Sequence, residues 1–182
     1  MGSLPDTGAD AHEASVSFLA VLLLAACAAY SGSGLRPGEA GVDDVIRVMG
    51  EPAMRWRDPD GSVQLAYPRG PFGFHTFMVR IGPDGKLQRI VNVLDSNGFA
   101  QIRPGMTEAQ VLRVLGPPYP GWTAYFKARD ELVWEWRYCD DLSEAARFNV
   151  LFDGATGTVR SSMSLTEAQR GLCGRGRCWC SR

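Results

Sequence analysis

The sequence predicts an α+β protein built from two tandem repeats, each a short helix followed by about four antiparallel strands, with the helices packed on the sheet. Two observations lead to this prediction. Residues 45–52 align with residues 111–118 when the chain is shifted by 66 positions, and Trp56 then falls on Trp122. In both copies, apolar residues first recur at helical spacing and then at every second position, as in strands with one buried face.

The composition narrows the class of protein. The chain has 182 residues, and its 19 basic and 20 acidic side chains give a formal net charge of -1. This balance excludes a disordered tail, a collagen or a coiled coil, and it provides no electrostatic reason to bind nucleic acid. Only two histidines, His12 and His75, are present, which argues against a multi-histidine metal or acid/base centre.

The N-terminal segment has the pattern of a lipoprotein signal. Residues 16–26 are almost wholly apolar, and Cys27 follows directly after Leu24-Ala25-Ala26, which resembles a bacterial lipobox. At ~1.5 Å per residue such a run reaches only about half of a ~30 Å hydrocarbon core, so it has the length of a signal-peptide core. We therefore expect residues 1–26 to be removed, Cys27 to be lipidated and residues 27–35 to form a tether. A buried helix with an inert Cys27 is the alternative, favoured by the lack of Lys and Arg in residues 1–15.

The first repeat is expected over residues 36–101. A helical stripe begins at Val42 and ends at Met49, and Gly50 with Pro52 supplies the stop. A short strand is expected at Trp56, and strand-like alternation follows at three later places, residues 63–67, 77–81 and 87–94.

The second repeat is expected over residues 102–165 and has the same order. Thr107 and Gln110 have the spacing of a capping box, and Gly116 ends the helix. A leading strand is expected at Trp122, and alternation then marks residues 132–138 and 148–152. Because small repeats with one short helix are marginal alone, we expect the two to fold as one body with a shared or continuous sheet.

Four cysteines lie beyond the lipobox. Cys139 is in the second repeat, while Cys173, Cys178 and Cys180 are in an arginine-rich tail over residues 166–182. In an oxidising compartment they could form two disulfides in any of three connectivities. A metal knuckle is the alternative, but the tail has no paired CxxC and no nearby histidine, so we expect no metal and no cofactor. The basic tail is either a solvated end or a contact for anionic lipid head groups.

Aromatic residues are dense in the second repeat. Trp122, Trp134, Trp136 and Tyr138 fall within a short stretch, three of them on one strand face. They are either the core of the second sheet or, where the sheet is only partly covered, a protein-binding surface, since aromatic side chains are common binding anchors.

We expect no catalysis. His75 is the only histidine after the lipobox, and its place in the alternation that includes Phe77 favours a half-buried structural role. No nucleophile elbow, phosphate loop or zinc-protease helix motif is present in the sequence.

Residues 103–118, and more weakly residues 36–52, resemble the BamE/SmpA-type outer-membrane lipoproteins, which share the Pro-Gly turn and the short helix ending Val-x-x-Leu-Gly-x-Pro. The resemblance implies an α+β fold anchored by lipid to the outer membrane and facing the periplasm; one member is an accessory subunit of the machine that inserts β-barrels. The tandem arrangement also resembles the β-lactamase inhibitory proteins.

These observations together favour a lipid-anchored envelope protein. We expect a non-catalytic binding or scaffold module at the outer membrane, acting in outer-membrane protein assembly or envelope integrity, with the membrane and an envelope protein as partners. The alternative is an inhibitor that clamps a periplasmic enzyme with its sheet face.

Overall fold

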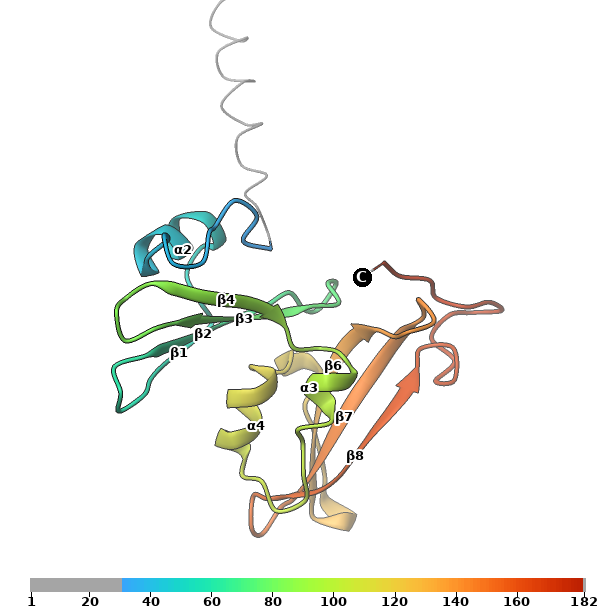
Figure 1. Cartoon of the computed structure of the whole chain (residues 1–182). Helices are drawn as coiled ribbons and strands as arrows, with labels where there is room; N and C mark the ends of the chain where they lie inside the picture. Colours follow the sequence, from blue (N-terminus) through green and yellow to red (C-terminus); the bar gives the residue numbers. More distant parts are fainter. Residues whose placement is uncertain (1–30, 182) are drawn as a thin grey trace, which may run out of the picture.

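The computed structural model describes residues 31–181, and it shows the same helix-and-meander unit twice (Figure 1). The expected signal peptide, residues 1–26, and the expected lipidation site Cys27 lie outside these described residues.

The first repeat contains one helix and a four-stranded antiparallel sheet in the order β1-β2-β3-β4. Its elements are α2 (Val42–Met49), β1 (Met54–Arg57), β2 (Val63–Pro68), β3 (Thr76–Ile81) and β4 (Leu87–Asn92).

The second repeat has a matching sheet in the order β5-β6-β7-β8, again antiparallel throughout. Its elements are α4 (Glu108–Leu115), η1 (Pro120–Trp122), β5 (Ala124–Phe126), η2 (Lys127–Arg129), β6 (Glu131–Cys139), β7 (Ala145–Asp153) and β8 (Val159–Thr166). A short helix, α3 (Ser96–Phe99), joins the repeats. The predicted fold class is confirmed.

Helix boundaries follow the local chemistry. In α4, the Thr107 hydroxyl accepts a hydrogen bond from the Gln110 N–H at 3.3 Å, and the Gln110 side chain accepts one from the Thr107 N–H at 2.8 Å, which completes the capping box. Both helices end on a glycine with positive φ, 84° at Gly50 and 74° at Gly116. Glycine adopts this conformation without strain, so the two stops are built alike.

Each helix covers one apolar core. Under α2, Val45 packs with Leu65 and Val79, and under α4, Val111 packs with Val150 and other side chains of the second sheet. Because side chains alternate between the two faces of a strand, the apolar residues predicted from the sequence face the helix and form the core.

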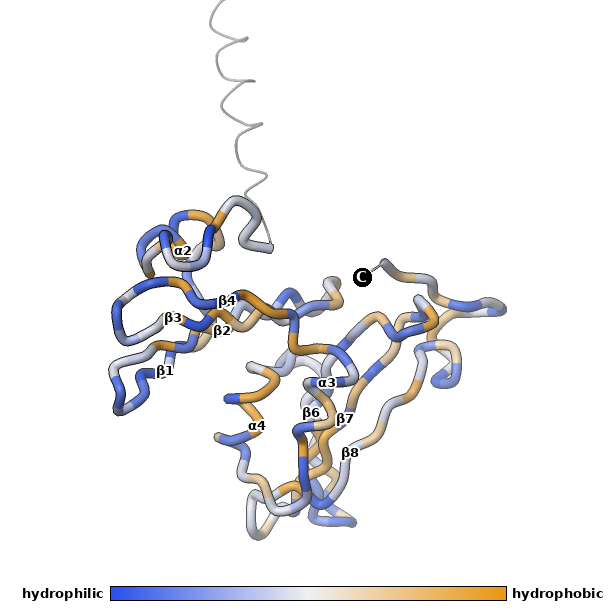
Figure 2. Tube along the Cα trace, in the orientation of Figure 1, coloured by the Kyte–Doolittle hydropathy of each residue, from blue (hydrophilic) through white to orange (hydrophobic). Residues whose placement is uncertain are grey.

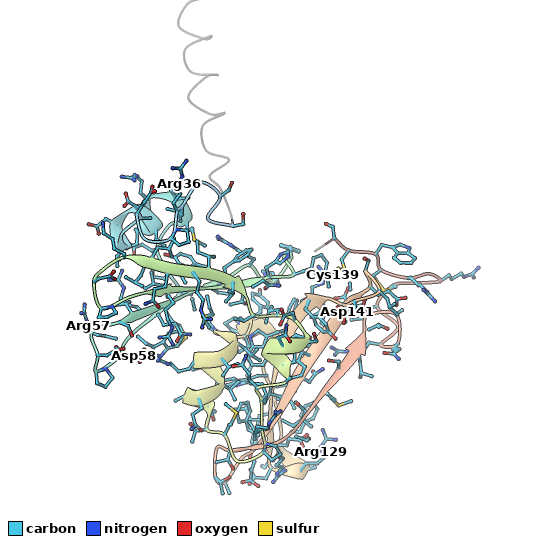
Figure 3. All side chains as sticks on the ribbon, viewed as in Figure 1. Arg36, Arg57, Asp58, Arg129, Cys139 and Asp141 are labelled. Atoms are coloured by element: carbon cyan, nitrogen blue, oxygen red, sulfur yellow. A yellow bond between two sulfur atoms is a disulfide. The ribbon has the colours of Figure 1, made fainter. Side chains whose placement is uncertain are left out.

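Helix α4 also packs on the first sheet, so it lies between the two sheets (Figures 1 and 2). The face of the first sheet that points away from α2 is buried at Gln64 and Ala66. The Gln64 side chain donates a 2.7 Å hydrogen bond to the carbonyl of Arg113 in α4. Arg113 also pairs with Asp58, which Figure 3 shows on the α4 side of the first repeat. The expected shared or continuous sheet is therefore wrong: two separate sheets are joined through α4, because α3 and α4 come between β4 and β5.

The leading strand of the second repeat starts later than predicted. Trp122 lies in the 3-10 turn η1, and strand β5 begins at Ala124. Prolines explain the difference, because residues 117–122 contain Pro117, Pro118 and Pro120, and proline has no N–H to donate to a ladder.

Candidate functional site

A cavity of about 360 Å³ lies between the two repeats. Three segments form its walls: the end of the β2–β3 hairpin, the proline-rich linker over residues 117–122, and strand β6 at residues 135–137. Figure 1 shows the hairpin reaching toward the second repeat, and the Arg137 guanidinium donates a 3.1 Å hydrogen bond to the Phe72 carbonyl in that hairpin. Neither repeat alone encloses this cleft.

The cleft has an apolar and aromatic lining. Tyr119 and Trp122 meet edge to face with ring centroids 5.0 Å apart, and Tyr119 stays 39% exposed. Met54 and Leu94 contribute aliphatic surface from the first repeat and the connection that follows it. Two cavities of about 380 and 410 Å³ elsewhere are lined by more charged groups, arginines in one and aspartates in the other. The inter-repeat cleft is therefore the best candidate for an apolar ligand group.

An arginine–carboxylate network supports the cleft from the outer face of the second sheet. The Arg147 guanidinium bonds to Glu135 at 2.7 Å and to Glu167 at 2.6 Å, and Arg137 holds Glu167 with two parallel bonds of 2.8 Å. Arg170 binds the second oxygen of Glu135. Paired bonds of this kind fix geometry as well as charge, so the network makes the β6 wall rigid.

The network also offsets the repulsion between two neighbouring arginines. Arg137 and Arg147 stand directly opposite on β6 and β7, an arrangement that is unfavourable unless a counter-charge lies between them. Burial by itself would raise the pKa of Glu167, but the hydrogen bonds from Arg137 and Arg147 outweigh burial and hold its pKa below the usual value. Glu167 therefore remains an ionised acceptor.

Trp122 is one of the two predicted binding residues that line the cleft, and Trp136 is the other. The Arg147 guanidinium lies 3.8 Å from the centroid of the Trp122 indole ring, a cation–π contact. The half-buried ring thus links the cleft lining to the charged network behind it.

The other three predicted binding aromatics belong to the core. Trp134, Trp136 and Tyr138 are all less than 10% exposed, and they pack under α3 and α4 with Phe148. These three residues do not form an exposed protein-binding face, because the helices cover that side of the second sheet. Only Trp136 touches the cleft, where its indole N–H donates a 3.2 Å hydrogen bond to the Gly116 carbonyl.

His75 lines the cleft and stacks on Phe77, with ring centroids 5.5 Å apart. Burial lowers its pKa, so the ring is neutral at pH 7. No hydrogen bond within residues 31–181 involves its ring nitrogens.

The four cysteines form two disulfides. Cys139 joins Cys180 and so ties the tail to the second sheet, while Cys173 joins Cys178 in a small loop (Figure 3). The sulfurs of Cys173 and Cys178 lie within 4.8 Å of a Glu167 oxygen. Because these sulfurs are bonded to each other and Glu167 holds two arginines, the trio is not a metal ligand set.

The lower part of the outer face of the second sheet is less covered. Phe126 is 45% exposed and Met163 is 46% exposed, and Val133 and Leu151 lie half-buried between them in the register of the sheet. These four apolar side chains share the face with polar neighbours, the Arg129 guanidinium lies 4.7 Å from the Phe126 ring centroid, and none of the four lines the cleft.

Sequence reasoning missed Glu135, Arg137, Arg147, Glu167 and Arg170. Charged residues that alternate along a strand are typical of a solvated face, and nothing in the sequence revealed that the tail would bring Glu167 and Arg170 back over β6 and β7. The pairing of Arg137 with Arg147 would have indicated a carboxylate between them, but this pairing is known only from the register of β6 and β7.

Fold and cleft define a two-repeat α+β protein with an apolar groove between its repeats. No protein-family model and no curated protein matches the sequence. A solved structure described as an OsmE-type osmotically inducible lipoprotein is similar, with 25% identity over 42% of this chain and 80% of that chain and a TM-score of 0.34. Membership of the BamE/SmpA-type family stays a prediction from the sequence. Among residues 31–181, no helix has the length and apolar character needed to cross a membrane.

Proposed function

We propose that this protein is a lipid-tethered, non-catalytic binding module of the bacterial envelope that holds a segment of a partner protein in the cleft between its repeats. The observation that carries the proposal is the cleft itself, an apolar cavity of about 360 Å³ with an aromatic rim and a rigid charged wall. Pockets of this size and lining are typical of binding sites.

The chemistry of the cleft favours binding over turnover. Glu167 is ionised and held by two arginines, so it has no proton to give and no free lone pair aimed at a substrate. His75 is kept neutral by burial and stacked on Phe77. General acid–base catalysis needs a group that can exchange a proton with a bound substrate, and Glu167 is committed to its two arginines. Within residues 31–181, His75 makes no side-chain hydrogen bond to a carboxylate that would orient it or to a nucleophile that it could activate.

The lipid tether is proposed from the lipobox at Cys27. A lipid anchor on a short tether at the outer membrane would hold the two repeats at the periplasmic face, where disulfides such as Cys139–Cys180 persist. Mass spectrometry of the purified protein should show an N-terminus at Cys27 carrying acyl chains, and Cys27→Ser should release the protein from membranes. An unprocessed and unlipidated N-terminus would contradict the tether.

The cleft itself is tested by partner recovery from intact envelopes after chemical crosslinking. Tyr119→Ala should reduce recovery at least 10-fold, because it removes an exposed ring of the cleft rim. Tyr125→Ala is the matched control: Tyr125 is 57% exposed but lies on β5, away from the cleft lining. Equal recovery with both variants would contradict binding in the cleft.

An enzyme-inhibitor role is the second candidate, and the apolar patch of Phe126 and Met163 on the outer sheet face is the observation that favours it. An inhibitor that clamps its target with this face should lose binding on Met163→Asp and keep it on Tyr119→Ala. The opposite result is expected for the cleft-binding module.

A further inference from the structure

We propose that the edge of strand β6 inside the cleft accepts an extended segment of the partner chain as an added antiparallel strand. This inference rests on the proposed function and specifies the chemistry of the partner: a stretch of polypeptide in which apolar residues alternate with polar ones. Four features of the structure lead to it.

The first feature is that β6 has a long uncovered edge. Strand β5 pairs with β6 only from Glu131 to Val133, although β6 continues to Cys139. Beyond Val133 no strand pairs with this edge: the turn η1 contacts β6, and residues 135–137 are part of the cleft lining.

The second feature is the direction of the main-chain groups. The Asp140 N–H donates a 3.0 Å hydrogen bond to the Glu144 carbonyl, which makes this a hydrogen-bonded pair of the β6–β7 hairpin. Because such pairs alternate in an antiparallel ladder, Trp134 and Trp136 turn their N–H and C=O groups toward β7. Glu135 and Arg137 therefore turn theirs toward the cleft.

No main-chain hydrogen bond between residues 31 and 181 joins Glu135 or Arg137 to the linker or to the β2–β3 hairpin. These two residues thus present two donors and two acceptors in the spacing of a strand edge. A row of this kind is a template for another strand.

The third feature is the comparison between the repeats. In the first repeat, β1 pairs with β2 as far as Ala66, the residue that matches Glu135 in the core stripe, and the Ala53 N–H donates a 2.9 Å hydrogen bond to the Ala66 carbonyl. In the second repeat, Trp122 lies in η1 and covers Arg147 instead. The first copy of the unit therefore has an antiparallel strand beside the position that matches Glu135, whereas β5 of the second copy ends before it.

The fourth feature is the adjoining apolar cavity. Side chains of an added strand would point alternately to the two sides of the sheet, and those on the cavity side would meet Tyr119 and the linker prolines. Strand β1 itself has such a pattern, with half-buried Met54 and Trp56 alternating with exposed Arg55 and Arg57. The same alternation defines the expected partner segment.

The test uses a synthetic peptide with the sequence of residues 53–58, acetylated and amidated at its ends, added to the full-length protein with its disulfides intact. Amide hydrogen exchange is followed at single-residue resolution. Without peptide, the Glu135 and Arg137 amides should exchange at least 10-fold faster than those of Trp134 and Trp136. Saturating peptide should slow them at least 10-fold.

Two N-methylated peptides serve as matched controls, one modified at Arg55 and one at Trp56. Only one of two adjacent amides can point at β6, so one analogue should lose binding at least 10-fold and the other should bind like the parent. Unchanged exchange at Glu135 and Arg137 under millimolar peptide, or equal binding by both analogues, overturns strand addition. Crosslinking of the partner at Tyr119 tests the proposed function separately. If the partner binds in the cleft without adding a strand, Tyr119 should still crosslink while the Glu135 and Arg137 amides stay unprotected. If the peptide protects these amides but no partner crosslinks at Tyr119, strand addition is supported and the proposed function is not.

Discussion

Val45 and Val111 provide a matched test of whether the repeats form one folding unit. They occupy equivalent positions of α2 and α4, and both are 0% exposed. Valine to alanine removes two methyl groups at ~0.8 kcal/mol each and leaves a small cavity, so each substitution should cost about 2 kcal/mol. In a protein of this size that lowers the Tm by about 4–8 °C.

The structure predicts that both variants shift one common transition, because α4 packs on both sheets and Gln64 and Arg113 bond across the repeats. Calorimetry and urea unfolding followed by tryptophan fluorescence and far-UV circular dichroism would measure this. Two separate transitions, with Val45→Ala moving only one and Val111→Ala only the other, would refute the packing argument.

Three further predictions follow from individual contacts. Glu167→Gln should lower the free energy of unfolding by about 3–5 kcal/mol, since it leaves the buried Arg147 and the half-buried Arg137 without their shared carboxylate. The pKa of Glu167 is lowered in the folded state, so its contribution is complete above the usual glutamate pKa and is lost as the pH falls through the folded pKa. Acid titration should therefore destabilise the wild type more than the variant. Gly116→Ala should cost more stability than Gly50→Ala, by about 1–3 kcal/mol, because both have positive φ but only at Gly116 would the new Cβ lie 2.9 Å from a Thr76 methyl; chemical denaturation that ranks them equally would contradict this. Cys139→Ser should cost about 2–4 kcal/mol and expose the tail to proteolysis, whereas Cys173→Ser should cost less because its disulfide closes a far shorter loop.

Local patterns in the sequence predicted the elements that depend on local chemistry. The helix ends at Gly50 and Gly116, the capping box at Thr107 and the alternating strands all lie where the residue pattern places them. The short helix α3 was missed, although Asp95 caps it by accepting a 2.8 Å hydrogen bond from the Gly98 N–H. A four-residue helix has too few positions for a stripe to show.

The features of the cleft depend on contacts between distant parts of the chain, and the sequence could not reveal them. Trp134 and Trp136 form the same apolar stripe whether helices cover them or not, and only the packing of α3 and α4 decides that they are core. Glu135 and Glu167 are separated by the whole β7–β8 hairpin, yet both bind Arg147. To predict the cleft, one would also need to know that the linker prolines keep Trp122 out of a strand.

The most direct test of cleft binding is site-specific photo-crosslinking in living cells. A photoreactive phenylalanine derivative at Tyr119 in the full-length protein should give a discrete crosslinked product with one partner protein. The same residue at Tyr125, equally aromatic and more exposed, should give none. Crosslinking at Tyr125 without crosslinking at Tyr119 would contradict binding in the cleft and place the partner elsewhere on the protein.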